Sequence, residues 1–346
     1  MSSRLEDILH IRKNHSFYDE GLWEFVSQRL GRNLINLTNT NLQARLASID
    51  RNIQFLDNGV TPRDHLHPDQ RGWLSPWWWL RARYVTTLEF KHRSITPMPS
   101  PVIPAMPMLA EGFTGVVGGG KRLLVRISKI EWLMETLVHG RLRFASAALY
   151  RDPALNSARG DDELRKAYRR PGQVVAITTQ AGRKIKAIGD VEFASARVAQ
   201  DGRELVDIPY WLCSFSSDLD PRLFEEFASD QPENDGCLVI FEPHKFVQRA
   251  LPELTRIARF AKKSLCPVDY FDPYYLDSRD LAVVQSKDFR YAYQREMRFV
   301  LDPGIASAIS DGNHVFANIG TIEDIAAIYS REGEKLAGTG PSSFLV

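Results

Sequence analysis

The 346-residue chain is poor in cysteine, with only Cys213, Cys237 and Cys266, spaced widely along it. An odd number of scattered thiols argues against a disulfide framework and against a paired-cysteine zinc site. The histidines offer no alternative, because His65 and His67 lie in a predicted loop without a cysteine or glutamate at ligand spacing. We therefore expect reduced thiols, an intracellular protein and no bound metal.

The sequence also lacks a long apolar run and a strong excess of charge. No apolar stretch reaches about 18 residues, the length that suggests a membrane span, and residues 1–7 lack the apolar core of a signal peptide. The formal net charge is +1, so any polyanion binding has to come from a local basic patch. These absences predict a soluble, cytoplasmic protein without a membrane partner.

The composition and the predicted secondary structure of the chain change twice along its length. Residues 1–96 carry apolar side chains at helical spacing, most regularly over 41–56. Residues 97–120 are rich in proline and then glycine, which predicts an extended linker and a flexible joint. Residues 121–346 mix strand and helix patterns. We therefore predict an α+β domain preceded by a small all-α accessory domain.

Several elements of the α+β part have clear local signals. The spacing predicts a strand over 123–127 and a helix over 129–138 that Gly140 closes. A helix ending near Arg169-Arg170 is expected after a charged run, and a basic amphipathic helix is expected over 252–265. Residues 291–301 read as a strand with alternating faces.

Trp77, Trp78 and Trp79 follow the helix-start signal Ser75-Pro76. Three consecutive tryptophans cannot share one helix face, so at least one must meet another element or a partner. Tryptophan is usually well buried, which favours a packing cluster. The alternative is a stacking platform for nucleic acid, flanked by basic side chains.

The predicted strand 291–301 places Gln294, Glu296 and Arg298 on one face. A carboxylate at the centre of an apolar strand is unusual, because burying a charge is costly without a partner. The structural explanation is an ion pair of Glu296 with Arg298 and a neighbouring strand. The functional explanation depends on what precedes this strand in the chain.

Three strand-borne features occur in order: Arg126, then Ser214-Phe215-Ser216, then Gln294-Arg295-Glu296. This order resembles the ADP-ribosyltransferase superfamily of the Arg–Ser–Glu type. The resemblance implies a split β-sheet core with surrounding helices and NAD as the substrate held in its cleft.

Residues 121–330 also resemble a bacterial domain family long catalogued without a function. The segments that match its motifs are Gly140–Phe144, Arg151–Pro153, Cys213–Ser216 and Gln294–Arg298. The chain departs from that family in three places. Arg151 replaces the usual asparagine, the Cys-Phe-Ser motif has an extra serine, and Gln294 replaces the first glutamate.

The resemblance implies a role for each of these residues in breaking the nicotinamide–ribose bond. That reaction builds positive charge on the sugar, as glycoside hydrolysis does, and Glu296 would stabilise the charge. Ser216, with Ser214 as the alternative, would fix the ribose and orient Glu296. Gln294 would meet the acceptor, and Arg126 would bind the pyrophosphate or the adenosine ribose.

Phe144 and Tyr150 complete the cofactor-binding set that the resemblance implies. The predicted activity is transfer of ADP-ribose from NAD to a protein or nucleic acid, in a bacterial toxin or an antiviral defence system. An inhibitory partner protein would fit such a system. One alternative is an NAD glycohydrolase, with water as acceptor. The other is a non-catalytic module that grips nucleic acid with Trp77–Trp79 and basic helices.

Overall fold

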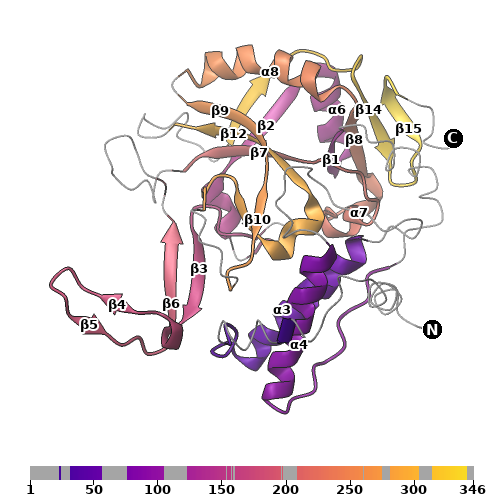
Figure 1. Cartoon of the computed structure of the whole chain (residues 1–346). Helices are drawn as coiled ribbons and strands as arrows, with labels where there is room; N and C mark the ends of the chain where they lie inside the picture. Colours follow the sequence, from indigo (N-terminus) through magenta and orange to yellow (C-terminus); the bar gives the residue numbers. More distant parts are fainter. Residues whose placement is uncertain are drawn as a thin grey trace.

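A computed structural model describes residues 23–24, 32–56, 76–104, 123–152, 154–156, 158, 160–195, 197, 209–259, 261–274, 281–303 and 314–340. This part of the chain contains a large antiparallel sheet with helices packed around it (Figure 1). The predicted α+β class is therefore confirmed. None of the helices in these residues is both long and apolar enough to cross a membrane.

The central sheet has nine strands among the described residues. In chain order they are β1 (Leu124–Lys129), β2 (Arg141–Ser146), β7 (Trp211–Ser216), β8 (Asp235–Ile240), β9 (Lys262–Pro267), β12 (Glu296–Asp302), β13 (His314–Asn318), β14 (Ala326–Ser330) and β15 (Lys335–Gly338). One path runs β13-β2-β7-β1-β8-β14-β15, and β12 and β9 extend from β7.

The sheet branches at β7, because this strand has three neighbours. β12 pairs along the whole of β7, from Leu301 opposite Trp211 to Glu296 opposite Ser216. A strand has only two edges, so β2 and β1 share the opposite edge. β2 pairs with residues 211–212, and β1 pairs with Ser216 alone. Residues 213–215 lie where β2 and β1 diverge.

The two faces of the sheet are covered differently. α6 (Ile130–His139) and α8 (Pro243–Ile257) contribute Leu137 and Phe246 to the main core, together with β-strand side chains such as Phe299 (Figure 1). On the other face, the short α7 (Leu223–Glu226) packs Phe224 against β1, β8 and β14. As predicted, α6 ends at Gly140, whose left-handed backbone (φ 62°) closes the helix.

The N-terminal helices are α3 (Asn39–Leu56) and α4 (Pro76–His92). The predicted helix 41–56 is confirmed within α3, and its apolar stripe is buried. Both helices share a core with residues of the α+β part, including Tyr270 and Phe289. The buried guanidinium of Arg45 in α3 binds both oxygens of Asp272, at 2.8 and 2.7 Å. The helices are thus docked on the sheet domain, and the domain boundary at residue 96 stays a prediction.

The described part of the proline-rich segment, residues 97–104, has no helix or strand, as predicted. Two glutamine side chains of α3 hold it in place. Gln43 exchanges two hydrogen bonds of 2.9 Å with the backbone of Met98. Gln54 donates to the carbonyl of Pro101 and accepts from the amide of Ile103. The extended chain is therefore anchored along the helix.

A two-stranded arm projects from the body beside α3 (Figure 1). Its base is the antiparallel pair β3 (Lys166–Pro171) and β6 (Asp190–Ser195), and its outer part is β4 (Ile177–Thr178) with β5 (Lys184–Ile185). The single-turn η3 (Gly172–Val174) joins the two parts. The predicted helix ending near Arg169-Arg170 is wrong, because these residues pair in β3 with Glu192 and Val191 of β6.

Two further predicted elements are corrected. The basic helix expected over 252–265 is instead the end of α8, which begins at Pro243, followed by β9 on the edge of β12. The strand expected over 291–301 begins only at Glu296, because residues Phe289–Gln294 form the 3₁₀ helix η5. The glycine-rich joint over 112–120, and His65 and His67, lie outside the described residues.

The described residues contain four further short elements. They are η2 (Ala147–Arg151), η4 (Pro232–Asn234), and the parallel pair β10 (Asp269–Phe271) and β11 (Ser286–Asp288). β11 leads directly into η5, so it brings Lys287 close to the start of β12.

Candidate functional site

A cavity of about 180 Å³ opens beside β7, at the point where the sheet branches. Its wall includes most of the residues that the sequence marks out for chemistry: Arg126, Tyr150, Ser214, Ser216, Gln294 and Glu296. They come from β1, η2, β7, η5 and β12, which are far apart in sequence. The structure thus brings these six residues to one site.

The β7–β12 register explains why the serines and Glu296 share a face. Glu296 lies opposite Ser216, and Arg298 lies opposite Ser214. Directly opposite residues of antiparallel strands point to the same side. Ser214 Oγ donates to Glu296 Oε1 at 2.6 Å, whereas Ser216 Oγ donates to the carbonyl of Asp218 at 2.7 Å. The serine that contacts Glu296 is therefore Ser214, not the preferred Ser216.

A left-handed residue sets the relative position of Gln294 and Glu296. Arg295 has φ 50° and joins η5 to β12. This conformation costs a non-glycine residue about 1–2 kcal/mol. The buried Arg295 side chain stabilises it by donating to Asp218 Oδ2 at 3.0 Å and to the carbonyl of Phe55 at 2.9 Å. The predicted strand alternation is wrong here, yet both Gln294 and Glu296 still reach the cavity.

Two cations bind the Glu296 carboxylate. Lys287 Nζ donates to Oε2 at 2.8 Å, and Arg298 Nε donates to Oε1 at 2.8 Å. Burial by itself would raise the pKa of Glu296, but the charges of Arg298 and Lys287 outweigh it and hold that pKa well below the ordinary value. Glu296 is therefore ionised at neutral pH. The ion pair with Arg298 expected from the sequence is present.

The charged cluster extends beyond Glu296. Arg298 is completely buried and also donates to Glu163 Oε1 at 2.6 Å. Lys166 in turn lies 3.5 Å from Glu163 and 2.6 Å from Asp161. Alternating charges thus run from the cavity to the base of the arm. Such a cluster is stable only while each buried charge keeps its partner.

Arg126 lines the cavity but does not point toward Glu296. Its Nη1 atom donates to Cys213 Sγ at 2.9 Å, and its guanidinium lies 6.0 Å from the centre of the Phe215 ring. Along β7, residues 213 and 215 alternate with Ser214 and Ser216, so Arg126 lies toward the opposite face of β7. Burial raises the pKa of the Cys213 thiol, which is therefore not a nucleophile at neutral pH.

The two predicted aromatic residues differ in position. Tyr150 lies in the cavity, where burial, and then the negative charges of Glu296 and Glu163, raise the pKa of its phenol. It therefore stays neutral. Phe144 is fully buried in the main core, where its ring meets the Phe299 ring edge-on with centres 6.1 Å apart. Its assignment as a cofactor contact is corrected, because β2 directs it away from the cavity.

Lys287 and Glu163 are the site residues that the sequence did not single out. Lys287 links Gln294 and Glu296, at 3.0 and 2.8 Å. It lies in β11, a strand too short to show a pattern. Glu163 belongs to the charged run 159–163, which reads as solvated surface, yet it is almost completely buried.

Trp78 and Trp79 are buried among Ile49, Tyr270 and Phe289. Their rings meet edge-on with centres 4.6 Å apart. These two tryptophans therefore form a packing cluster, and the stacking-platform alternative is wrong for them. Within the residues that the structure describes, no group of three or more His, Cys, Asp or Glu side chains is placed to hold a metal ion.

No known family model, curated protein or solved structure matches the chain.

Proposed function

We propose that the chain breaks the nicotinamide–ribose bond of NAD at the Glu296 cavity and transfers ADP-ribose to a macromolecular acceptor. The observation that carries this proposal is the 2.6 Å hydrogen bond from Ser214 to Glu296 in the cavity that Gln294 and Tyr150 also line. A hydroxyl that fixes an ionised carboxylate is the arrangement that a sugar cation needs.

In this reaction the bond between the ribose C1′ and the nicotinamide nitrogen breaks. Its electron pair leaves with the nicotinamide, and positive charge develops on the ribose ring. The acceptor then bonds to C1′ and loses a proton. Glu296 is already ionised, and Ser214 and Arg298 hold its carboxylate in place, so the carboxylate itself does not have to turn to stabilise this charge. Tyr150 provides a neutral aromatic surface for the nicotinamide ring.

Binding of NAD requires the site to change. Pockets for drug-sized ligands usually measure about 300–1,000 Å³, whereas this cavity measures about 180 Å³. Only the nicotinamide–ribose end would fit it. Lys287 is the group to be displaced, because a ribose hydroxyl can replace its hydrogen bond to Glu296 Oε2. Arg298 remains paired with Glu163 in that event.

NAD hydrolysis is the second candidate, and the position of Gln294 favours it. Gln294 is 4% exposed. Its amide donates to the carbonyl of Ala158 at 2.7 Å and accepts from Lys287. A residue held in this way does not reach a macromolecule at the surface, whereas water can enter the cavity. Nicotinamide release without labelling of any acceptor would select hydrolysis.

The test uses NAD labelled in its adenosine part, with nicotinamide release and label transfer as separate measurements. Glu296→Gln keeps the side-chain shape and should lower kcat by about 10²–10³-fold, as loss of one preorganised group does. Glu253→Gln, at an ion pair of α8 that does not line the cavity, is the matched control. Equal turnover by the wild type and Glu296→Gln, or no binding and no cleavage of NAD by the wild type, refutes the proposal.

Ser214 is a positioning residue in this scheme. Ser214→Ala should lower kcat while KM stays nearly unchanged. Glu296 can still contact the ribose in this variant, but its carboxylate is no longer held in the orientation that stabilises the sugar cation. Ser214→Thr keeps the hydroxyl and should restore most of kcat. A purely structural role would instead lower stability without this division between kcat and KM, or without rescue by threonine.

A further inference from the structure

The arm carries a local excess of basic residues. Residues 164–189 contain no aspartate or glutamate, although the whole protein has a net charge of only +1. The same stretch contains seven basic residues, namely Arg165, Lys166, Arg169, Arg170, Arg183, Lys184 and Lys186. β6 adds the acidic Asp190 and Glu192, so the arm together with Arg165 keeps a net positive charge, which is the local basic patch that polyanion binding requires.

The outer part of the arm is exposed. Arg183, Lys184 and Lys186 are all exposed, and Ile188 beside them is fully exposed. Figure 1 shows β4 and β5 extending well away from the rest of the molecule. Burial therefore does not explain these side chains. Exposed basic side chains on a projecting ribbon can contact the phosphates of a nucleic acid.

The base of the arm is firmly attached to the body. The amide of Arg169 donates to the carbonyl of Pro273 at 2.7 Å. The rings of Tyr168 and Phe271 meet edge-on with centres 5.5 Å apart. Asn36 also donates to Asp190 at 2.7 Å. A ligand that binds the exposed part of the arm is thus held at a defined position relative to the body.

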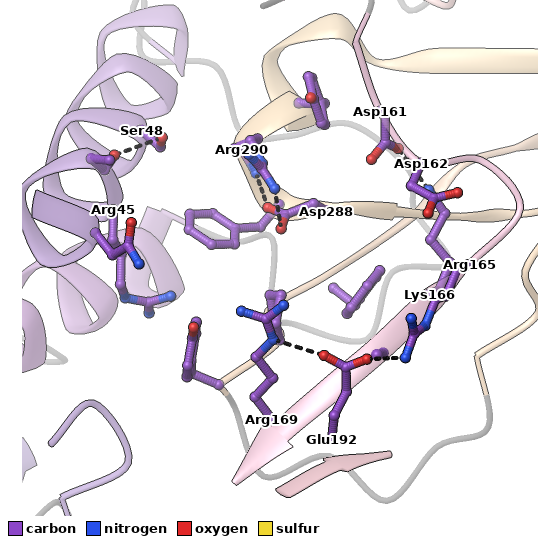
Figure 2. A pocket seen from close by; sticks show the side chains of 18 of the residues that line it. Arg45, Ser48, Asp161, Asp162, Arg165, Lys166, Arg169, Glu192, Asp288 and Arg290 are labelled. Carbon is purple, nitrogen blue, oxygen red and sulfur yellow. Dashed lines mark hydrogen bonds and ion pairs between the residues drawn. The ribbon is translucent and has the colours of Figure 1, made fainter. Parts of the chain in front are cut away.

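The arm leads into a second cavity, of about 520 Å³. Figure 2 shows Arg165, which directly precedes β3, and Arg169 of β3 on either side of Glu192, with Arg290 and Asp288 across the cavity. Its volume lies within the range of about 300–1,000 Å³ that is usual for small-ligand sites. Tyr274 and Tyr291 also line it. Guanidinium groups and aromatic rings together suit phosphate and base.

We propose that the arm and this cavity bind a single strand of nucleic acid. The basic residues of the outer arm contact its phosphates, and the cavity receives one nucleotide. A single strand fits better than a duplex, because an unpaired base enters a cavity without the unstacking that a duplex has to undergo. The arginine groups paired with Glu192 and Asp288 are pre-oriented, and phosphate oxygens can bond to their guanidinium groups.

In the proposed function, this single strand is the acceptor of ADP-ribose, and its part in catalysis therefore rests on that function. The two cavities are neighbours along the chain. Gly160 and Asp161 line the larger one, while Glu163 lines the cavity of Glu296. Lys166 lines the larger cavity and pairs with both Asp161 and Glu163. A strand held in the larger cavity is therefore close to the reacting sugar.

The binding experiment uses the full chain and fluorescein-labelled single-stranded RNA of about 20 nucleotides, longer than usual single-strand sites. The outer-arm variant combines Arg183→Ala, Lys184→Ala and Lys186→Ala. The matched control combines Lys91→Ala, Lys245→Ala and Lys262→Ala, all exposed and outside the arm. Each variant removes three positive charges, so general electrostatics change equally.

We expect the outer-arm variant to weaken binding about tenfold or more. The slope of log K against log salt concentration should fall in magnitude by about 2, because each of the three lost phosphate contacts contributes about 0.7. The control triple should bind as the wild type does. Arg165→Ala, at a half-exposed side chain, should also weaken binding through the cavity. Thermal unfolding of each variant checks that the fold is intact.

Equal binding by the two triple variants, or no binding of RNA by the wild type, overturns the proposal. Tighter binding of a duplex of the same length refutes the single-strand assignment. Equal competition by poly-glutamate shows only general adsorption to acidic polymers and also refutes it. Glu296→Gln should keep wild-type RNA affinity, so loss of NAD turnover and loss of RNA binding are separate failures.

Discussion

The buried charge cluster gives a sharp prediction at Arg298. This guanidinium is fully buried between Glu163 and Glu296, with its nitrogens 2.6 and 2.8 Å from their carboxylate oxygens. Arg298→Met keeps a long side chain but removes the charge. Glu163 then keeps Lys166 at 3.5 Å and Lys287 at 3.9 Å, whereas Glu296 keeps Lys287 at 2.8 Å.

Removing one partner of a buried ion pair typically costs about 3–5 kcal/mol, because a charge is left without compensation. We expect a loss in the free energy of unfolding of that size at neutral pH. The exposed pair of Arg256 with Glu253 supplies the control. Arg256→Met should cost no more than about 1 kcal/mol, as exposed pairs do.

The pH dependence of stability should differ between the proteins. In the wild type the pKa of Glu296 is held below its ordinary value, so its contribution is complete above about pH 4.3 and disappears as the pH falls through the lower native value. In Arg298→Met the buried Glu296 carboxylate lacks its main cation, and burial favours uptake of a proton. The native variant then binds a proton that the unfolded chain does not bind.

Between pH 7 and 5, Arg298→Met should therefore become more stable relative to the wild type, by up to about 1.4 kcal/mol for each pH unit over which one extra proton is bound. Urea unfolding at several pH values measures this difference. Parallel pH profiles for wild type and Arg298→Met would refute the reasoning, and so would a loss no larger than that of Arg256→Met.

Two further predictions concern the scaffold. A Cβ atom at Gly140 would lie 2.0 Å from the carbonyl oxygen of Gly320, whereas one at Gly320, which also has a positive φ (78°), meets nothing within 4 Å. Thermal unfolding should therefore show that Gly320→Ala lowers the free energy of unfolding by about 1–2 kcal/mol and that Gly140→Ala lowers it clearly more. Equal losses for the two variants would contradict the close approach of Gly140 to Gly320. Trp79→Ala should lower the free energy of unfolding by about 3–5 kcal/mol and speed amide hydrogen exchange in α3, because Trp79 is buried between α3 and Phe289. Unchanged exchange rates in α3 would contradict the shared core.

The elements that sequence patterns predict correctly are those whose signals are local. α3 has an apolar residue at each helical turn and α6 has a glycine at its end, so neither depends on distant partners. The pattern of β3 wrongly indicates a helix, because the identity of this strand depends on β6, about 25 residues later in the chain, where Arg169 faces Glu192. β12 begins later than predicted because Arg295 has a left-handed backbone that ends η5. A hydrogen bond from its side chain to the carbonyl of Phe55 stabilises this conformation, and such a distant contact leaves no signal in the sequence.

The choice between the two serines shows how far a motif can define a site. β7 ends at Ser216, and the chain turns at once through Ser217 and Asp218, whose backbone engages the Ser216 hydroxyl on both its donor and acceptor sides. Serine next to aspartate at a strand end is a turn signal in its own right. That signal occupies Ser216 in the turn and leaves Ser214, at an interior strand position, as the hydroxyl available to Glu296. No sequence pattern marks Lys287 in the same way, because its contact with Glu296 depends on the connection from β11 through η5 to β12. The order of the motifs therefore identifies which strands meet, while the turn and the register decide which side chains touch.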